Sequence, residues 1–206
     1  GVQTCALPIL NLKLPAGRKV AVVETDRREA EAVASLLPRF IDPQAGRVLI
    51  DDTDIAWGTL DSVRAESILV SGEDPCISGS VRENLLGDSP GVTLETITAA
   101  AKRTHAHEFI QGLPQGYETI VGEQGVMLDP VQSFQLGLAR ALVRDPALLI
   151  IDEPNLPLDD NLRTQFDEAY RALSEGRTVL FLPRRMSRSE EHTSELQSPC
   201  NLVCRL

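Results

Sequence analysis

One stretch of the sequence decides the fold: Ala147-Leu-Leu-Ile-Ile-Asp-Glu-Pro-Asn-Leu-Pro-Leu-Asp159. Its apolar run has the length of a strand and no polar interruption, which is typical of a parallel strand that is buried on both faces. Asp152 and Glu153 follow this run directly. Because ligands of open α/β sheets bind at the carboxyl ends of the strands, the stretch predicts a functional edge that carries two adjacent carboxylates.

Helices and further strands are predicted on both sides of this stretch. Residues 132–144 have apolar side chains at helical spacing and end at an Asp-Pro pair. A weakly alternating segment, 10–14, precedes a turn and a second strand at 19–23, which together predict a hairpin. The other predicted elements are strands at 67–70 and 178–182 and helices at 60–64, 93–103, 105–111 and 161–173.

The two ends of the sequence are related through their coding DNA. The codons GGA GTT CAG ACG TGT GCT CTT CCG ATC encode residues 1–9, and the opposite strand in a shifted frame encodes Ser-Glu-Glu-His-Thr-Ser-Glu-Leu, the sequence of 189–196. Both ends therefore resemble translated sequencing adapter. We expect 1–9 and 188–206 to be artefactual tails outside the fold; the alternative is a chance match beside a disordered tail.

Composition narrows the class of protein. Residues 10–187 are enough for one domain with a sizeable core. The net charge of −10 argues against a nucleic-acid partner. Cys76 is the one cysteine outside the tails, as expected for a reduced cytosolic protein. No segment approaches the roughly 20 apolar residues that cross a bilayer, so a membrane role would need a partner or a further segment.

The order of helix, Asp-Pro, apolar strand and Asp-Glu resembles the Walker B region of ABC transporter nucleotide-binding domains. Segments 18–23, 36–40 and 42–51 match the exporter-type pattern without a gap, and 109–125 is the longest match. The last part of that match, 119–125, resembles the X-loop that touches the coupling helices of the transmembrane domain. The resemblance covers 10–187 and implies an α/β fold: a RecA-like P-loop NTPase core with a helical subdomain at about 75–140, cut short at both ends.

The same register places 24–32 where the family has its phosphate loop, G-x-x-x-x-G-K-[ST]. That loop works because glycine N–H groups close on the phosphates, the lysine reaches the terminal phosphates and the hydroxyl holds magnesium. This chain has Glu24, Arg27 and Glu29 at the glycine positions, Ala30 at the lysine and Glu31 at the hydroxyl. A carboxylate roughly 5 Å from a phosphate charge would cost about 3 kcal/mol at an effective dielectric constant of about 20.

Two hypotheses follow for the phosphate loop. Asp26 and Glu29 have capping-box spacing, so the following helix is expected to satisfy its own first N–H groups instead of offering them to an anion. This favours loss of nucleotide binding. The alternative is an unorthodox phosphate site built on Arg27 and Arg28.

The Q-loop and the switch position have also changed. Segment 71–75 takes the place of the Q-loop, and the family's glutamine is replaced by Gly72 or, when the alignment is anchored on Asp-Pro, by Glu73. Arg184 replaces the switch histidine. Arginine stays charged and does not serve as a neutral hydrogen-bonding partner.

The family's LSGGQ motif becomes Leu128-Asp-Pro-Val-Gln132. In the family this helix start grips the γ-phosphate that the opposite subunit holds. Asp129 is a good N-cap and Pro130 suits the first helical position, so a sound helix is predicted. Asp129 also adds a negative charge and Pro130 removes an N–H, so the anion site, of which Gln132 is the last position, is expected to be lost.

Three acids match family positions without change. Asp152 corresponds to the Walker B magnesium ligand, Glu153 to the residue that polarises the attacking water, and Asp159 to the D-loop aspartate at the dimer contact. The resemblance thus implies MgATP as the cofactor. The alternative is that Asp152 and Glu153 are only the polar end of a buried strand and that no cofactor is held.

The resemblance implies a member of an ATPase family, at the cytoplasmic face of a membrane, paired with a second cassette and with the transmembrane domain of an exporter. The replaced residues favour a degenerate cassette that does not hydrolyse ATP and acts as a structural and coupling subunit. Two alternatives stay open: an active transporter ATPase with atypical phosphate contacts, and a regulatory binding module without a transport partner.

Overall fold

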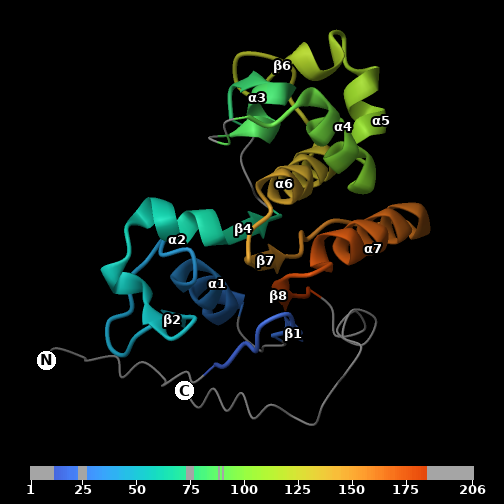
Figure 1. Cartoon of the computed structure of the whole chain (residues 1–206). Coiled ribbons are helices and arrows are strands. Elements are labelled where there is room, and N and C mark those ends of the chain that lie inside the picture. The colour runs from blue at the N-terminus through green and yellow to red at the C-terminus, as the bar shows by residue number, and fades with distance from the viewer. Residues whose placement is uncertain (1–11, 23–26, 73–76, 88, 90, 185–206) are drawn as a thin grey trace, which may run out of the picture.

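The computed structural model describes residues 12–22, 27–72, 77–87, 89 and 91–184. Both predicted tails, and Glu24, Glu73 and Cys76, lie outside these ranges. At the centre is a parallel sheet in the order β1-β8-β7-β4 (Figure 1). Its strands are β1 (Lys19–Ala21), β4 (Ser67–Ser71), β7 (Leu148–Asp152) and β8 (Thr178–Leu182).

Helices cover both faces of the sheet. On one face lies α1 (Arg27–Leu36), and on the other lie α6 (Pro130–Arg144) and α7 (Asp160–Ser174). Every residue of β7 is buried, which explains its unbroken apolar run. Alternate side chains serve the two faces: Leu148 and Ile150 pack with α1, and Leu149 and Ile151 pack with α6 and α7.

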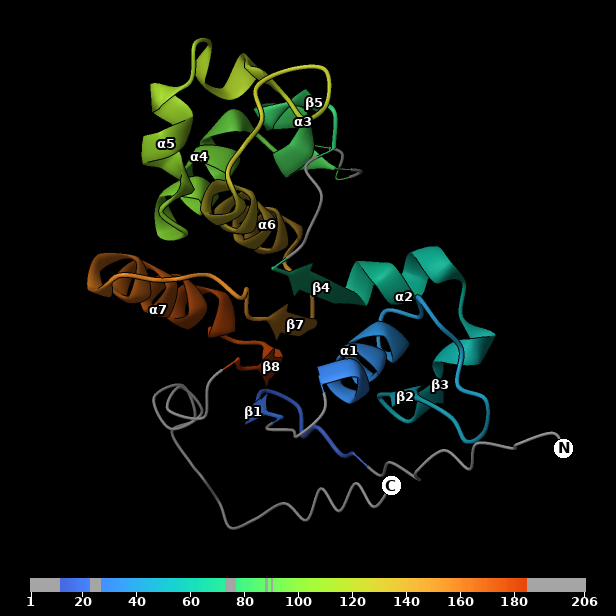
Figure 2. The same ribbon diagram turned by 180° about the vertical axis from the view of Figure 1, so that it is seen from behind.

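A helical subdomain lies beside the sheet, with α6 between the two (Figures 1 and 2). It contains α3 (Val81–Leu86), α4 (Leu94–Arg103) and α5 (Ala106–Gly112), followed by the short helix η2 (Gly116–Glu118). The strands β5 (Gly79–Ser80) and β6 (Ile120–Val121) pair at its edge. Because Leu136 of α6 packs in the helical cluster and Leu138 packs in the sheet cluster, α6 belongs to both cores.

Shorter elements connect α1 to β4. They are the antiparallel strands β2 (Leu49–Ile50) and β3 (Thr53–Asp54), the 3-10 helix η1 (Ile55–Trp57) and the helix α2 (Leu60–Glu66). Arg39, which follows α1, donates hydrogen bonds from Nη1 to the carbonyl oxygens of Ile55 and Gly58. These bonds tie the connection to the end of α1.

The predicted hairpin at 10–14 and 19–23 is wrong in its described part. Residues 12–14 form no strand, and β1 pairs in parallel with β8, with Lys19 opposite Val179. A short strand is paired by whichever neighbour buries it, and β8 offers a buried apolar edge. Within the described ranges, no helix is both long and apolar enough to span a membrane.

Candidate functional site

The carboxyl ends of three neighbouring strands meet at one edge of the sheet. β7 ends at Asp152, which lies opposite Ser71 of β4 and Leu182 of β8 in the strand register. Asp152 and Glu153 are only 7% and 3% exposed. Two buried acids at adjacent positions need cationic partners or hydrogen bonds, because an uncompensated buried charge is strongly unfavourable.

Arg27 supplies the partner of Asp152. It is the first residue of α1, and its Nη2 forms an ion pair with Asp152 Oδ1. The same guanidinium donates from Nε to Glu31 Oε1, one helical turn further on, at 3.1 Å. Arg27 therefore lies between a buried acid of the sheet and a half-exposed acid of the helix.

Arg184 supplies the partner of Glu153. Its backbone N–H donates to Glu153 Oε2 at 2.9 Å, and its side-chain Nε donates to the carbonyl oxygen of Glu153, also at 2.9 Å. The N–H of Glu153 in turn donates to the carbonyl of Leu182 at 3.1 Å. Each of the two acids is thus held by an arginine from another part of the chain.

The positions of the phosphate loop do not form a loop in their described part. Because α1 begins at Arg27, positions 27–29 are helical, with Glu29 in the first turn. Glu24 and Asp26 lie outside the described residues, so the predicted capping box is not seen. Ala30 is 1% exposed and packs in the cluster of Leu148, Ile150 and Leu180. The residue at the family's lysine position therefore lies in the core.

Gly72 is packed directly against the residue that follows the two acids. A Cβ atom at position 72 would lie 2.3 Å from Pro154 Cα, so no side chain fits there without a backbone shift. Of the two residues considered for the family's glutamine, Gly72 is enclosed by this contact and Glu73 lies outside the described residues.

The predicted LSGGQ and D-loop residues cap helices. Gln132 N donates to Asp129 Oδ1 at 2.8 Å and Asp129 N donates to Gln132 Oε1 at 3.1 Å, which makes a complete capping box at the start of α6. Asp159 is the N-cap of α7 and accepts from Leu162 N at 2.8 Å. These bonds stay within the two helix starts, so none of them joins Asp129, Gln132 or Asp159 to the cluster around Asp152.

A cavity of about 150 Å³ opens beside Asp152 and Glu31. It is small compared with the roughly 300–1,000 Å³ of typical small-molecule sites. Across the described part of the chain, no group of three or more His, Cys, Asp or Glu side chains is placed to hold a metal ion. The cavity is lined by Glu31, Ala34, Ser35, Leu69, Ser71, Asp152 and Arg184.

The sequence predicts Arg27, Asp152, Glu153 and Arg184 as site positions but does not predict how they pair. Arg27 is a candidate contact for phosphate in the sequence, whereas in the structure it pairs with Asp152. One signal in the sequence could have indicated the pairs: Arg27 and Arg184 replace other residues of the family pattern, while the acids Asp152 and Glu153 are kept. Spacing along the chain could not show which arginine meets which acid.

Comparison with known proteins identifies the family. The family model described as ABC transporter matches residues 32–156. The chain is 35% identical over 188 residues to an ATP-dependent lipid A-core flippase of Chromohalobacter salexigens, a match that covers 91% of this chain and 32% of the relative. It is 39% identical over 178 residues to the putative multidrug export ATP-binding/permease protein YgaD of Bacillus subtilis, covering 86% and 31%.

A solved structure agrees with these matches. It is titled as a bacterial Atm1-family ABC exporter with ATP bound, and it aligns with a TM-score of 0.79 and 34% identity over 88% of this chain and 32% of that one. The chain belongs to the ABC transporter family, and it is a nucleotide-binding domain of exporter type with a RecA-like α/β core. It spans about a third of the length of these relatives.

Proposed function

We propose that this chain is a degenerate nucleotide-binding domain of an ABC exporter that does not hydrolyse ATP and acts as a structural and coupling subunit. One observation carries the proposal: Ala30, at the position of the phosphate-binding lysine, is buried in the core at 1% exposure, in a helix that already begins at Arg27. A phosphate loop needs flexible glycines with free N–H groups and a lysine that reaches outward. The described part of this segment offers neither.

The residues present do not fit MgATP. Glu31 stands at the position of the magnesium-holding hydroxyl, and Asp152 already has a cationic partner in Arg27. Glu153, the family's water-polarising residue, accepts from the Arg184 N–H. At the position of the serine in LSGGQ, Asp129 would bring a negative charge toward phosphate. The same changes affect both surfaces that an exporter cassette contributes to a dimer.

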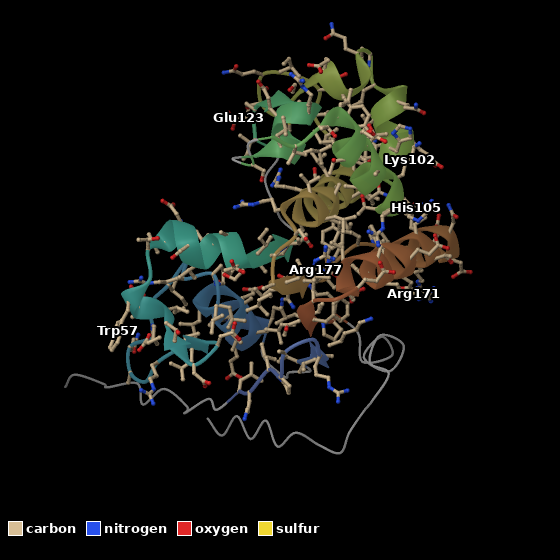
Figure 3. The ribbon with its side chains drawn as sticks, viewed as in Figure 1. Trp57, Lys102, His105, Glu123, Arg171 and Arg177 are labelled. Carbon is tan, nitrogen blue, oxygen red and sulfur yellow. The ribbon has the colours of Figure 1, made fainter. Side chains whose placement is uncertain are left out.

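Partners follow from the relatives. Their printed names include a flippase, a permease and an exporter, so we propose that this domain works at the cytoplasmic face of a membrane with a transmembrane domain and a second cassette. Segment 119–125 is the proposed contact. Glu123 stands at the surface of the helical subdomain (Figure 3). Exposed apolar side chains lie in and around this segment: Ile120 is part of it, Met127 follows it, and Ile77 precedes β5, which pairs with β6. Exposed apolar residues of this kind are common at protein interfaces.

Nucleotide binding by the full chain tests the proposal. A nucleotide at about 100 times its dissociation constant stabilises a protein by about 2.7 kcal/mol, which corresponds to a rise of about 5–10 °C in the melting temperature for a chain of this size. We expect no rise with millimolar MgATP. The matched control is the corresponding domain of the Atm1-family exporter, whose structure contains ATP.

A clear shift with MgATP would contradict the proposal. Steady ATP turnover that is abolished by Glu153→Gln would support the active-ATPase alternative instead. Co-purification of the chain with a membrane protein would exclude the alternative of a regulatory module without a transport partner.

A further inference from the structure

We infer that Arg27 is a built-in counterion that takes the place of the metal ion at Asp152, so that this edge of the sheet is electrostatically complete without magnesium. The inference rests on the proposed function, because a site closed to metal suits a cassette that does not hydrolyse nucleotide. It goes further in naming the side chain that replaces the metal and the acid that this side chain serves.

Arg27 contacts the residues at both of the family's magnesium-holding positions. In P-loop NTPases, magnesium is held by the hydroxyl of the phosphate loop and by the Walker B aspartate. Those two positions hold Glu31 and Asp152 in this chain, and the guanidinium of Arg27 contacts both. Nε donates to Glu31 Oε1 at 3.1 Å, while Nη2 pairs with Asp152 Oδ1. One cation between these two positions gives the charge arrangement of a metal site.

Burial indicates which of the two Arg27 contacts contributes more to stability. The side chain of Asp152 is 10% exposed and that of Arg27 is 22% exposed, whereas Glu31 is 51% exposed. Removing the cation that is paired with a buried carboxylate is strongly destabilising, while an exposed pair contributes little. Because arginine remains protonated at any physiological pH, the charge of Asp152 is balanced permanently and does not depend on the concentration of metal.

Arg184 holds the neighbouring Glu153 by hydrogen bonds: its backbone N–H donates to the Glu153 carboxylate, and its guanidinium donates to the Glu153 backbone carbonyl. Arg27 begins α1, Asp152 ends β7, and Arg184 follows β8. The two arginines therefore join three segments at the edge where the family places its nucleotide. Contacts between the helix and the strand ends are made within the chain and require no ligand.

The test measures the melting temperature of the full chain with and without millimolar MnCl2, in the absence of nucleotide. Arg27→Met should lower the melting temperature by at least about 5 °C, because Asp152 is left buried and unbalanced. Manganese should raise the melting temperature of this variant and leave that of the unmodified chain unchanged. The double variant Arg27→Met/Asp152→Asn should melt no lower than Arg27→Met and should not respond to manganese.

A matched control uses an exposed ion pair. Arg82 and Glu118 are 46% and 59% exposed and their atoms lie 3.1 Å apart, so Arg82→Met should change the melting temperature by no more than about 2 °C. If Arg27→Met does not fold, folding of the double variant supports the same conclusion, and its failure to fold contradicts it. Additive losses in the double variant, or an absence of any manganese response in Arg27→Met, would overturn the inference.

The experiments distinguish failure of the proposed function from failure of the counterion role of Arg27. Nucleotide binding by the unmodified chain, together with the expected manganese results, would remove the proposed function alone. Absence of nucleotide binding together with additive losses would remove the role of Arg27 alone.

Discussion

The helical subdomain and the carboxyl edge of the sheet differ in what holds them together. In the subdomain, apolar side chains such as Leu85 and Ile97 are fully or almost fully buried. Ser80 and Glu83 form a complete capping box, and the hydrogen bond from the backbone N–H of Ser80 lowers the pKa of Glu83. At the carboxyl edge, charged residues pair across segments instead, as Arg27 does with Asp152.

This difference separates the requirements of the fold from those of nucleotide binding. The α/β core needs buried apolar residues at alternating and helical positions, and it keeps them. Nucleotide binding needs a few polar groups at the strand ends, which the packing does not require. These groups can therefore be replaced while the fold persists, so family membership does not by itself establish activity. Substitutions in the apolar core and at the carboxyl edge of the sheet can test this difference.

The largest effect is expected from the scaffold that both cores share. Phe134 of α6 is 0% exposed and packs edge-to-face with Phe166, with the ring centroids 5.3 Å apart. Phe134→Ala should reduce the free energy of unfolding by about 3–5 kcal/mol, measured by urea titration. Met127→Ala is the control, since Met127 is 73% exposed, and should change it by less than about 0.5 kcal/mol. Equal losses in the two variants would show that Phe134 contributes no more to the core than an exposed side chain does.

A smaller effect is expected when the family's lysine is put back. Ala30→Lys inserts a long charged side chain beside Leu148 and Ile150, and overpacking alone should destabilise the domain by about 1–3 kcal/mol. The control Ala32→Lys makes the same change at an exposed position of α1 and should be nearly neutral. Neither variant should bind MgATP in an equilibrium dialysis assay. A stable Ala30→Lys variant that binds nucleotide would contradict the assignment of position 30 to the core.

The smallest effect is expected when the family's hydroxyl is restored. Glu31 is half exposed, and its contact with Arg27 should be worth no more than about 1 kcal/mol. Glu31→Ser should therefore leave the urea midpoint almost unchanged, as should the control Glu118→Ser at another exposed pair. A large loss for Glu31→Ser alone would mean that the carboxyl edge contributes to the fold as much as the cores do.

Local pattern predicted many elements well. β8 has the predicted bounds 178–182, and Asp129 and Pro130 begin α6 as cap and first residue. The hairpin at the N-terminal side was wrong because strand pairing depends on which neighbour is available in space. Other contacts could not be predicted either: His105 pairs with Glu168 and His107 hydrogen-bonds Tyr117, each at 2.8 Å. These partners belong to other elements, so the spacing of residues around the histidines does not indicate them.

The sequence by itself determined the class of fold and the family, because an apolar strand that ends in Asp-Glu and helices with their caps are local patterns of hydrophobicity and hydrogen bonding. Only the tertiary structure decided that Arg27 pairs with Asp152, that Arg184 holds Glu153 and that Ala30 faces the core. The reason is physical: burial and charge pairing depend on distances in space between segments that are far apart in the chain, and the spacing of residues along the chain does not contain those distances.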